Sequence, residues 1–211
     1  MGILLKKNID NYTYIGVWDI QENIDELLLK INLTSYEKEI YNSFKHDLRK
    51  LHWLSARAII KELLPEENIE IIYAPNDKPF TKNKKYNISI SHSHKKAAVI
   101  ISKNNHVGID IEKMQHKIEK LKEKFLCEEE LKNIGNKNIS EKLYVCWGAK
   151  ESLFKLYGKG NIIFAENFFV ETFEYKSKGE ITGYIKLNNL KNKYKIFYEA
   201  VDEYMLVYVI E

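Results

Sequence analysis

Two short segments combine residue types that could bind a metal ion and act on a phosphate. In the first, VGIDIEKM at 107–114, Asp110 and Glu112 are two positions apart. Side chains alternate along a strand, so both carboxylates are expected on one side, where they repel each other unless a cation lies between them. Oxygen ligands favour Mg²⁺ or Mn²⁺ over zinc. An exposed edge strand with ordinary solvated charges is the alternative, because the D-x-E pattern is common.

The second segment, WGAKESLFKLYGKG at 147–160, is predicted to be helical. Trp147, Glu151 and Lys155 are spaced by four and lie on one face of such a helix. Glu151 can serve as a third metal ligand or as a general base, and Lys155 can hold a phosphate or stabilise a leaving-group oxygen. Trp147 is expected to pack beneath them. The alternative is a solvent-facing Glu-Lys pair that contributes a few tenths of a kcal/mol.

A third segment, SISHSHKK at 89–96, is predicted to form a hairpin that offers donors to a phosphate. His92, Lys95 and Lys96 are those donors. Zinc bound by His92 and His94 is the alternative, although no cysteine lies at zinc-ligand spacing near them.

The elements that must position these segments recur in the same order twice. In the first half, the patterns predict strands at 12–20, 69–73, 88–91 and 97–102, a helix at 23–31, and a long helix from the Thr34–Glu37 capping box to Leu64. In the second half, they predict a strand at 106–112, one or two helices at 118–134, a helix from Ser140 as N-cap to Tyr157, and strands at 168–175, 180–187, 194–201 and 204–210. The prediction is an α+β fold of two similar α/β halves in a pseudo-twofold arrangement, 1–104 and 105–211, with the metal site in the second half.

Composition excludes several classes of protein. The 33 basic and 30 acidic residues leave a net charge of +3, which is too balanced for a protein that coats nucleic acid. No apolar run approaches the ~20 residues of a membrane span, and the N-terminal apolar stretch is too short for a signal peptide. Two cysteines, Cys127 and Cys146, form no disulfide framework. A cytoplasmic protein is expected.

Together, the motifs resemble those of the 4′-phosphopantetheinyl transferases, in the double-length form that activates surfactin-type synthetases. Gly108-Ile109-Asp110-Ile111-Glu112 resembles the family's G-(I/V)-D-(I/V)-E segment, and Trp147-x-x-Lys150-Glu151-Ser152-x-x-Lys155 its W-x-x-K-E-(S/A)-x-x-K segment. Ile90-Ser91-His92-Ser93 is similar to its (I/V)-S-H-(S/T) segment, Lys78-Pro79 to its K-P loop, and Phe125 with Glu130 to its F-x-x-x-E stretch. The five motifs occur in the family's order.

The resemblance implies an activity: transfer of the 4′-phosphopantetheine arm of coenzyme A to a serine of an apo acyl or peptidyl carrier protein, with release of adenosine 3′,5′-bisphosphate. It implies Mg²⁺, or Mn²⁺ in its place, bound by Asp110, Glu112 and Glu151. Glu151, or water held by the metal, would take the proton from the carrier serine.

The resemblance also implies contacts with coenzyme A. Lys155 matches the lysine near the pyrophosphate and Lys150 a second basic group. His92 and Ser91 match positions that touch the phosphates, and Lys78 the loop near the adenine. Candidates for the 3′-phosphate are basic residues of the first half: Lys38, Lys45, Arg49 and Lys50.

Two other functions remain open. One is a catalytically silent homologue that binds coenzyme A or a carrier protein, and the other is an unrelated metal-dependent phosphohydrolase. The expected partner is an acidic carrier protein of fatty acid, polyketide or peptide synthesis, with no nucleic acid and no membrane involved. Because the halves resemble each other, a monomer is expected.

Overall fold

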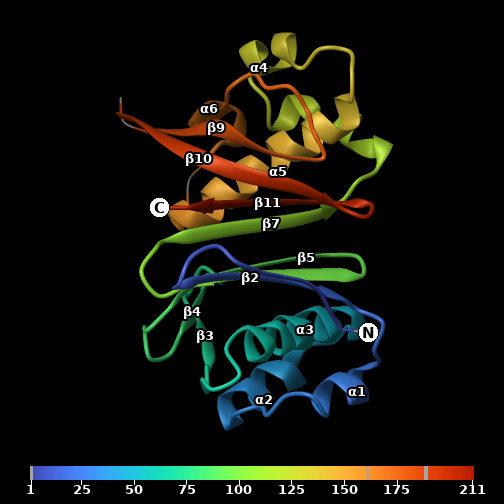
Figure 1. Cartoon of the computed structure of the whole chain (residues 1–211), viewed down its shortest axis with the longest axis vertical. Coiled ribbons are helices and arrows are strands. Elements are labelled where there is room, and N and C mark those ends of the chain that lie inside the picture. Colours follow the sequence, from blue (N-terminus) through green and yellow to red (C-terminus); the bar gives the residue numbers. More distant parts are fainter. Residues whose placement is uncertain (1, 161, 188–189) are drawn as a thin grey trace. The chain divides into compact units, whose positions relative to one another are not determined.

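The computed structural model describes residues 2–160, 162–187 and 190–211 (Figure 1). The chain divides into two compact units, Met1–His106 and Val107–Glu211. Each unit combines an antiparallel sheet with helices, which confirms the predicted α+β class.

The first unit is a four-stranded sheet with helices on one face (Figure 1). Its elements are β1 (Ile3–Asn8), β2 (Thr13–Asp19), α1 (Ile24–Leu28), α2 (Ser35–Ser43), α3 (Asp47–Leu63), β3 (Ile71–Tyr73), β4 (Pro79–Thr81), β5 (Asn87–Ser93) and β6 (Lys96–Ser102). The sheet order is β1-β2-β6-β5, and β3 pairs with β4 in a separate ribbon. Helix α3 packs on β2 and β6, with Ile59 next to Gly16 of β2, and Trp53 and Leu54 are buried in the same core cluster.

The long helix predicted to end at Leu64 is two helices, so that prediction was wrong in part. The chain is extended at Phe44 and His46, between α2 and α3. The break allows Glu37, near the start of α2, to meet Arg57 on α3. The predicted capping box at Thr34 is confirmed, as is the end of the helix just before Pro65.

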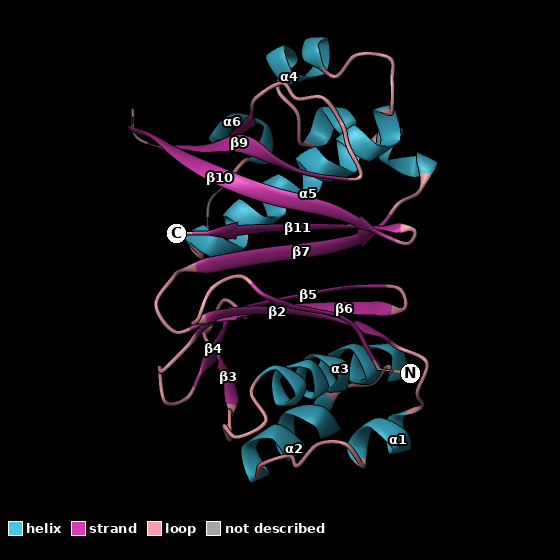
Figure 2. Cartoon of the chain, viewed as in Figure 1, coloured by secondary structure: helices cyan, strands magenta, loops and turns pink. Residues whose placement is uncertain are grey.

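The second unit is a five-stranded sheet in the order β7-β11-β10-β9-β8, crossed on one face by α5 (Figure 2). Its elements are β7 (Val107–Lys113), two 3-10 turns (His116–Lys120 and Lys122–Lys124), α4 (Glu128–Asn133), α5 (Ile139–Tyr157), α6 (Phe164–Asn167), β8 (Phe168–Val170), β9 (Lys178–Leu187), β10 (Leu190–Val201) and β11 (Tyr204–Ile210). The N-cap of α5 is Asn138, not Ser140 as predicted. The strand expected at 168–175 ends at Val170.

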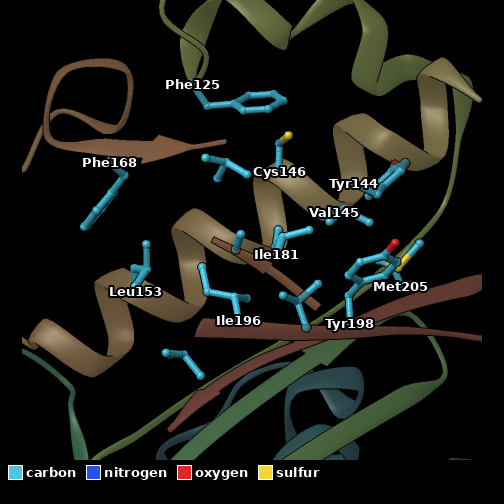
Figure 3. Close-up of a cluster of buried hydrophobic side chains, with 14 of the residues drawn as sticks. Phe125, Tyr144, Val145, Cys146, Leu153, Phe168, Ile181, Ile196, Tyr198 and Met205 are labelled. Atoms are coloured by element: carbon cyan, nitrogen blue, oxygen red, sulfur yellow. The ribbon is translucent and has the colours of Figure 1, made fainter. Parts of the chain in front are cut away.

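The core of this unit lies between α5 and the sheet (Figure 3). Val145 and Leu153 of α5 are fully buried in one cluster with Ile196 and Met205 of the strands. This packing fixes the rotation of α5 about its axis, and with it the positions of Glu151 and Lys155. None of the described helices combines the length and apolarity needed to cross a membrane.

Candidate functional site

Helix α5 approaches the sheet closely because a glycine lies on each side of their contact, Gly108 on the sheet and Gly148 on the helix. A Cβ built on Gly108 of β7 would lie 2.0 Å from the Ser152 carbonyl oxygen, and one on Gly148 would lie 2.6 Å from a methyl group of Val207. The Ser152 hydroxyl donates a hydrogen bond to the Val207 carbonyl at 3.0 Å. A side chain at Gly108 would therefore separate α5 from β7, which carries Asp110, and one at Gly148 would separate α5 from the neighbouring strand β11.

The close approach brings Lys155 onto Asp110. Lys155 Nζ donates to Asp110 Oδ1 at 2.8 Å and to the Ile109 carbonyl at 2.9 Å. The Asp110 side chain is 4% exposed and that of Lys155 25% exposed, so the ammonium is the part of this pair that solvent reaches. The structure thus brings together two residues that the sequence placed 45 positions apart.

Glu151 lies one turn before Lys155, and the pKa of its carboxyl group is raised well above the ordinary value. Burial, then the negative charge of Asp110, raises the pKa of Glu151 to about 7, and Glu112 adds to the rise while Lys155 opposes it. Asp110, Glu112 and Glu151 therefore act on one another electrostatically. A carboxylate with a pKa near neutrality can exchange a proton under ordinary conditions.

The chemistry of this donor set fits a hard divalent cation, since the three side chains offer only oxygen and their repulsion would be relieved by positive charge. Within residues 2–160, 162–187 and 190–211, however, no three His, Cys, Asp or Glu side chains are gathered closely enough to hold a metal ion. Lys155 supplies the positive charge next to Asp110 instead. Asp110, Glu112 and Glu151 as three metal ligands remain a prediction.

Lys150 lies in the core and not at a ligand-binding surface. It is completely buried, and its ammonium donates to Glu130 at 2.7 Å and to the carbonyls of Phe125 and Phe164. All three bonds hold neighbouring segments of the second unit. The expectation that Lys150 contacts coenzyme A does not agree with this burial, and we assign it a structural role.

Trp147 packs among aromatic side chains of the second unit. Its ring lies edge-on to Phe125, with centroids 5.3 Å apart, and tilted against Phe164 at 5.6 Å. The carbonyls of Phe125 and Phe164 also accept hydrogen bonds from the buried Lys150. Packing of Trp147 beneath Glu151 and Lys155 stays a prediction.

In the first unit, α3 and β5 enclose a cavity of about 190 Å³ with a basic edge. Arg49 Nη1 lies 2.7 Å from His92 Nε2 there. The cavity is lined by Arg49, His52, Trp53, Ala56, Arg57, Tyr73, Asp77, Pro79, Ile90 and His92. A guanidinium beside an imidazole is suited to an anion such as a phosphate.

The other predicted coenzyme A contacts do not line this cavity. Lys78 is half-buried, between Asp77 and Pro79, which do line it, and burial lowers the pKa of its amine. Ser91 is buried, and because side chains alternate along β5 it lies on the face opposite Ile90 and His92. Lys45 is exposed in the break between α2 and α3.

Sequence reasoning missed His52. It lines the cavity and lies one turn after Arg49 on α3. The helical spacing of the two residues was a signal for it, since residues three apart share a face.

Comparison with known proteins identifies the second unit. Residues 106–209, just under half of the chain, match the model of the 4′-phosphopantetheinyl transferase superfamily, ACPS. The chain carries a 4′-phosphopantetheinyl transferase superfamily domain. No curated protein matches the chain.

The superfamily domain contains the whole acidic group of the second unit. Asp110, Glu112, Glu151 and Lys155 all fall inside the matched residues, whereas the cavity of Arg49 and His92 lies outside them.

Proposed function

We propose that this protein transfers the 4′-phosphopantetheine arm of coenzyme A to a serine hydroxyl of an apo acyl or peptidyl carrier protein, in the manner of the surfactin-synthetase-activating transferases. One observation carries the proposal: a superfamily domain in which Asp110, Glu151 and Lys155 lie together at the contact of α5 with β7. No Walker loop or glycine-rich dinucleotide loop is present in the sequence, so side chains must hold the phosphates.

In the proposed reaction, the serine oxygen attacks the phosphorus that bears the pantetheine arm. The new bond is Oγ–P, the bond that breaks joins that phosphorus to the bridging pyrophosphate oxygen, and adenosine 3′,5′-bisphosphate leaves. Such a step needs alignment and charge neutralisation more than a protein nucleophile.

Four side chains of the second unit have a part in this step. Glu151, or water held by the metal, would accept the serine proton, and the pKa of about 7 that Glu151 has in the metal-free protein supports a part for it in proton transfer. Lys155, whose ammonium is partly exposed, moves from Asp110 to the pyrophosphate oxygens. Asp110, Glu112 and Glu151 would hold Mg²⁺, with Mn²⁺ as an alternative, and the bound cation would neutralise and polarise the pyrophosphate.

The first unit supplies the groups that bind coenzyme A in this proposal. Arg49 and His92 bind its 3′-phosphate, supported by their 2.7 Å approach at the edge of a cavity. Lys78, between the cavity-lining residues Asp77 and Pro79, lies near the adenine. Lys45 is a second candidate for the 3′-phosphate.

The setting of the reaction is also proposed. Cys127 and Cys146 are both free thiols, which supports a cytoplasmic location. A monomer that acts on an acidic carrier protein is the simplest form that supplies both sets of groups.

The test is the intact mass of a purified apo carrier protein after incubation with this protein, coenzyme A and Mg²⁺, with EDTA as the control. We expect a gain of one phosphopantetheine arm that EDTA abolishes. Coenzyme A cleavage without carrier modification would instead identify a phosphohydrolase.

A second candidate is a silent homologue that binds coenzyme A without turnover. It is favoured by the Lys155–Asp110 ion pair, which places an ammonium where the proposal needs a cation. Measurable coenzyme A binding with no modification of several apo carriers would support it.

A further inference from the structure

His52 is a buried residue that lines the basic cavity of the first unit. It lies on α3 one turn after Arg49, is 6% exposed, and lines the same cavity. Its ring stacks on that of His92 on β5, with centroids 4.2 Å apart and planes 14° from parallel. A buried polar ring needs a hydrogen-bond partner, and His52 Nε2 has one in the His94 carbonyl oxygen at 2.7 Å.

These contacts fix the proton positions on both rings. A carbonyl only accepts, so His52 Nε2 carries a hydrogen. Burial lowers the pKa of His52 and the positive charge of Arg49 adds to this, while the hydrogen bond to His94 opposes it, so the net direction favours the neutral ring. Arginine only donates, so His92 Nε2 accepts from Arg49 and the hydrogen of a neutral His92 is on Nδ1.

The hydrogen bond of His52 also reaches the turn that follows His92. His94 begins the two-residue connection between Ser93 and Lys96 and has a left-handed backbone, with φ of 49°. This conformation is unfavourable for a residue with a side chain and persists where the surroundings hold it. His52 therefore holds both the plane of the His92 ring and the carbonyl two residues later.

We propose that His52 is a positioning residue that orients His92 toward Arg49, so that the pair is set in advance for the phosphate of an incoming ligand. The identity of that ligand as coenzyme A rests on the proposed function. A phosphate oxygen can replace His92 Nε2 as the acceptor for Arg49. His92 Nε2 can then donate to the same phosphate once that nitrogen takes up a proton from solvent, while the stack keeps the His92 ring in place. The advantage is a smaller ordering cost when the anion binds.

Two variants separate the contacts of His52. His52→Phe keeps a stacked ring and loses the hydrogen bond, whereas His52→Gln keeps a donor and loses the stack. We expect the Kd of coenzyme A, measured by titration calorimetry, to rise about fivefold to tenfold in each. We expect kcat at saturating coenzyme A to change less than twofold. The control is His116→Ala, an exposed histidine of the second unit, with an unchanged Kd.

The ¹⁵N chemical shifts of the histidine rings test the same point without any ligand. In the unaltered protein at pH 8, we expect His52 with its hydrogen on Nε2 and His92 with its hydrogen on Nδ1. In His52→Phe we expect His92 to become a mixture of both tautomers. A His92 hydrogen on Nε2 in the unaltered protein would overturn the proposal even if no variant folds.

The calorimetric outcomes distinguish the two proposals. If the unaltered protein fails to bind coenzyme A, the proposed function is contradicted, while the ring shifts still test the role of His52. If coenzyme A binds and both His52 variants bind it as tightly as the unaltered protein, the positioning role is wrong and the proposed function stands.

Discussion

The two long helices of the molecule, α3 in the first unit and α5 in the second, share a buried ion pair of the same design. Arg57 on α3 binds Glu37 at 2.8 Å, and Lys150 on α5 binds Glu130 at 2.7 Å. Each glutamate is the third residue of a shorter preceding helix and closes that helix's capping box. In both units, one cation on the long helix thus anchors the start of a short helix.

The helices differ in what they present beyond this anchor. Helix α3 places Arg49 and His52 against His92, a cationic edge suited to an anion. Helix α5 places Glu151 and Lys155 against Asp110, an acidic group with one lysine. The same buried anchor thus accompanies two different sets of polar groups, to which the proposed function assigns phosphate binding in the first unit and the reaction at phosphorus in the second.

The largest effect is expected at Asp110. Asp110→Ala removes a proposed metal ligand and the partner of Lys155, so kcat for carrier modification should fall at least about 10³-fold, as when one group acting on the reacting centre is lost. Measurement is by intact mass of the carrier over time, with circular dichroism to show that the variant is folded. Glu112→Ala should cost less, because water can replace one ligand of Mg²⁺. A fully active Asp110→Ala would contradict the metal assignment.

The shared anchor predicts matched losses of stability. Lys150→Met and Arg57→Met each leave a buried glutamate without its cation, and each should lower the free energy of unfolding by about 3–5 kcal/mol. Urea denaturation measures both. Lys132→Met is the control, because its pair with Glu128 is exposed and should contribute less than about 1 kcal/mol. If only one of the two buried pairs proves costly, the correspondence between the units breaks down.

Glu151 predicts a pH dependence of stability in the metal-free protein. Its pKa is about 7 in the fold against an ordinary 4.5, so the folded state binds the additional proton between these values. Stability should therefore fall as pH rises through this interval. Glu151→Gln removes that loss and should be more stable than the unaltered protein by about 1–3 kcal/mol at pH 8, and equally stable near pH 4.

Thermal unfolding in EDTA from pH 4 to pH 8 checks this expectation. Exposed Glu129→Gln is the matched control and should follow the unaltered protein. A Glu151→Gln curve parallel to the unaltered one at every pH would show that Glu151 ionises normally.

The smallest effect is expected at Arg49. Arg49→Ala should raise the KM for coenzyme A about tenfold, the value of one charge-assisted hydrogen bond at a partly exposed site, and leave kcat within twofold. Lys61→Ala, at the far end of α3, serves as the control because its ammonium binds the Lys30 carbonyl instead. A fall in kcat with unchanged KM would contradict this, because Arg49 would then act in the chemical step and not in the binding of coenzyme A.

Local signals in the sequence predicted much of the fold. The capping box at Thr34 and the stop at Pro65 were found because they depend on neighbours within a few positions. The end of α5 at Tyr157 was predicted as well, and Gly158 follows it with a left-handed backbone. The break after α2 was missed because the apolar spacing continues through Phe44 and Leu48.

The parts of the site that escaped prediction depend on distant segments. A lysine in a helix has the same local sequence pattern whether it binds a ligand or a buried glutamate. The ammonium of Lys150 donates its hydrogen bonds to Glu130 and to the carbonyls of Phe125 and Phe164, all of which lie far from it in the sequence. His52 gains its partner from the turn at His94, which no helical pattern reveals. The contact between Asp110 and Lys155 agrees better with the sequence. Strand alternation limits the side on which Asp110 can lie, and helical spacing limits the face of the helix on which Lys155 can lie.

The division of labour between the units is tested most directly by calorimetric titration of coenzyme A into Asp110→Ala in EDTA. Our account predicts a Kd within about threefold of the unaltered protein, measured in the same buffer, from a variant that modifies no carrier when Mg²⁺ is restored. Loss of coenzyme A binding in Asp110→Ala would contradict it, because binding and reaction would then depend on the same group.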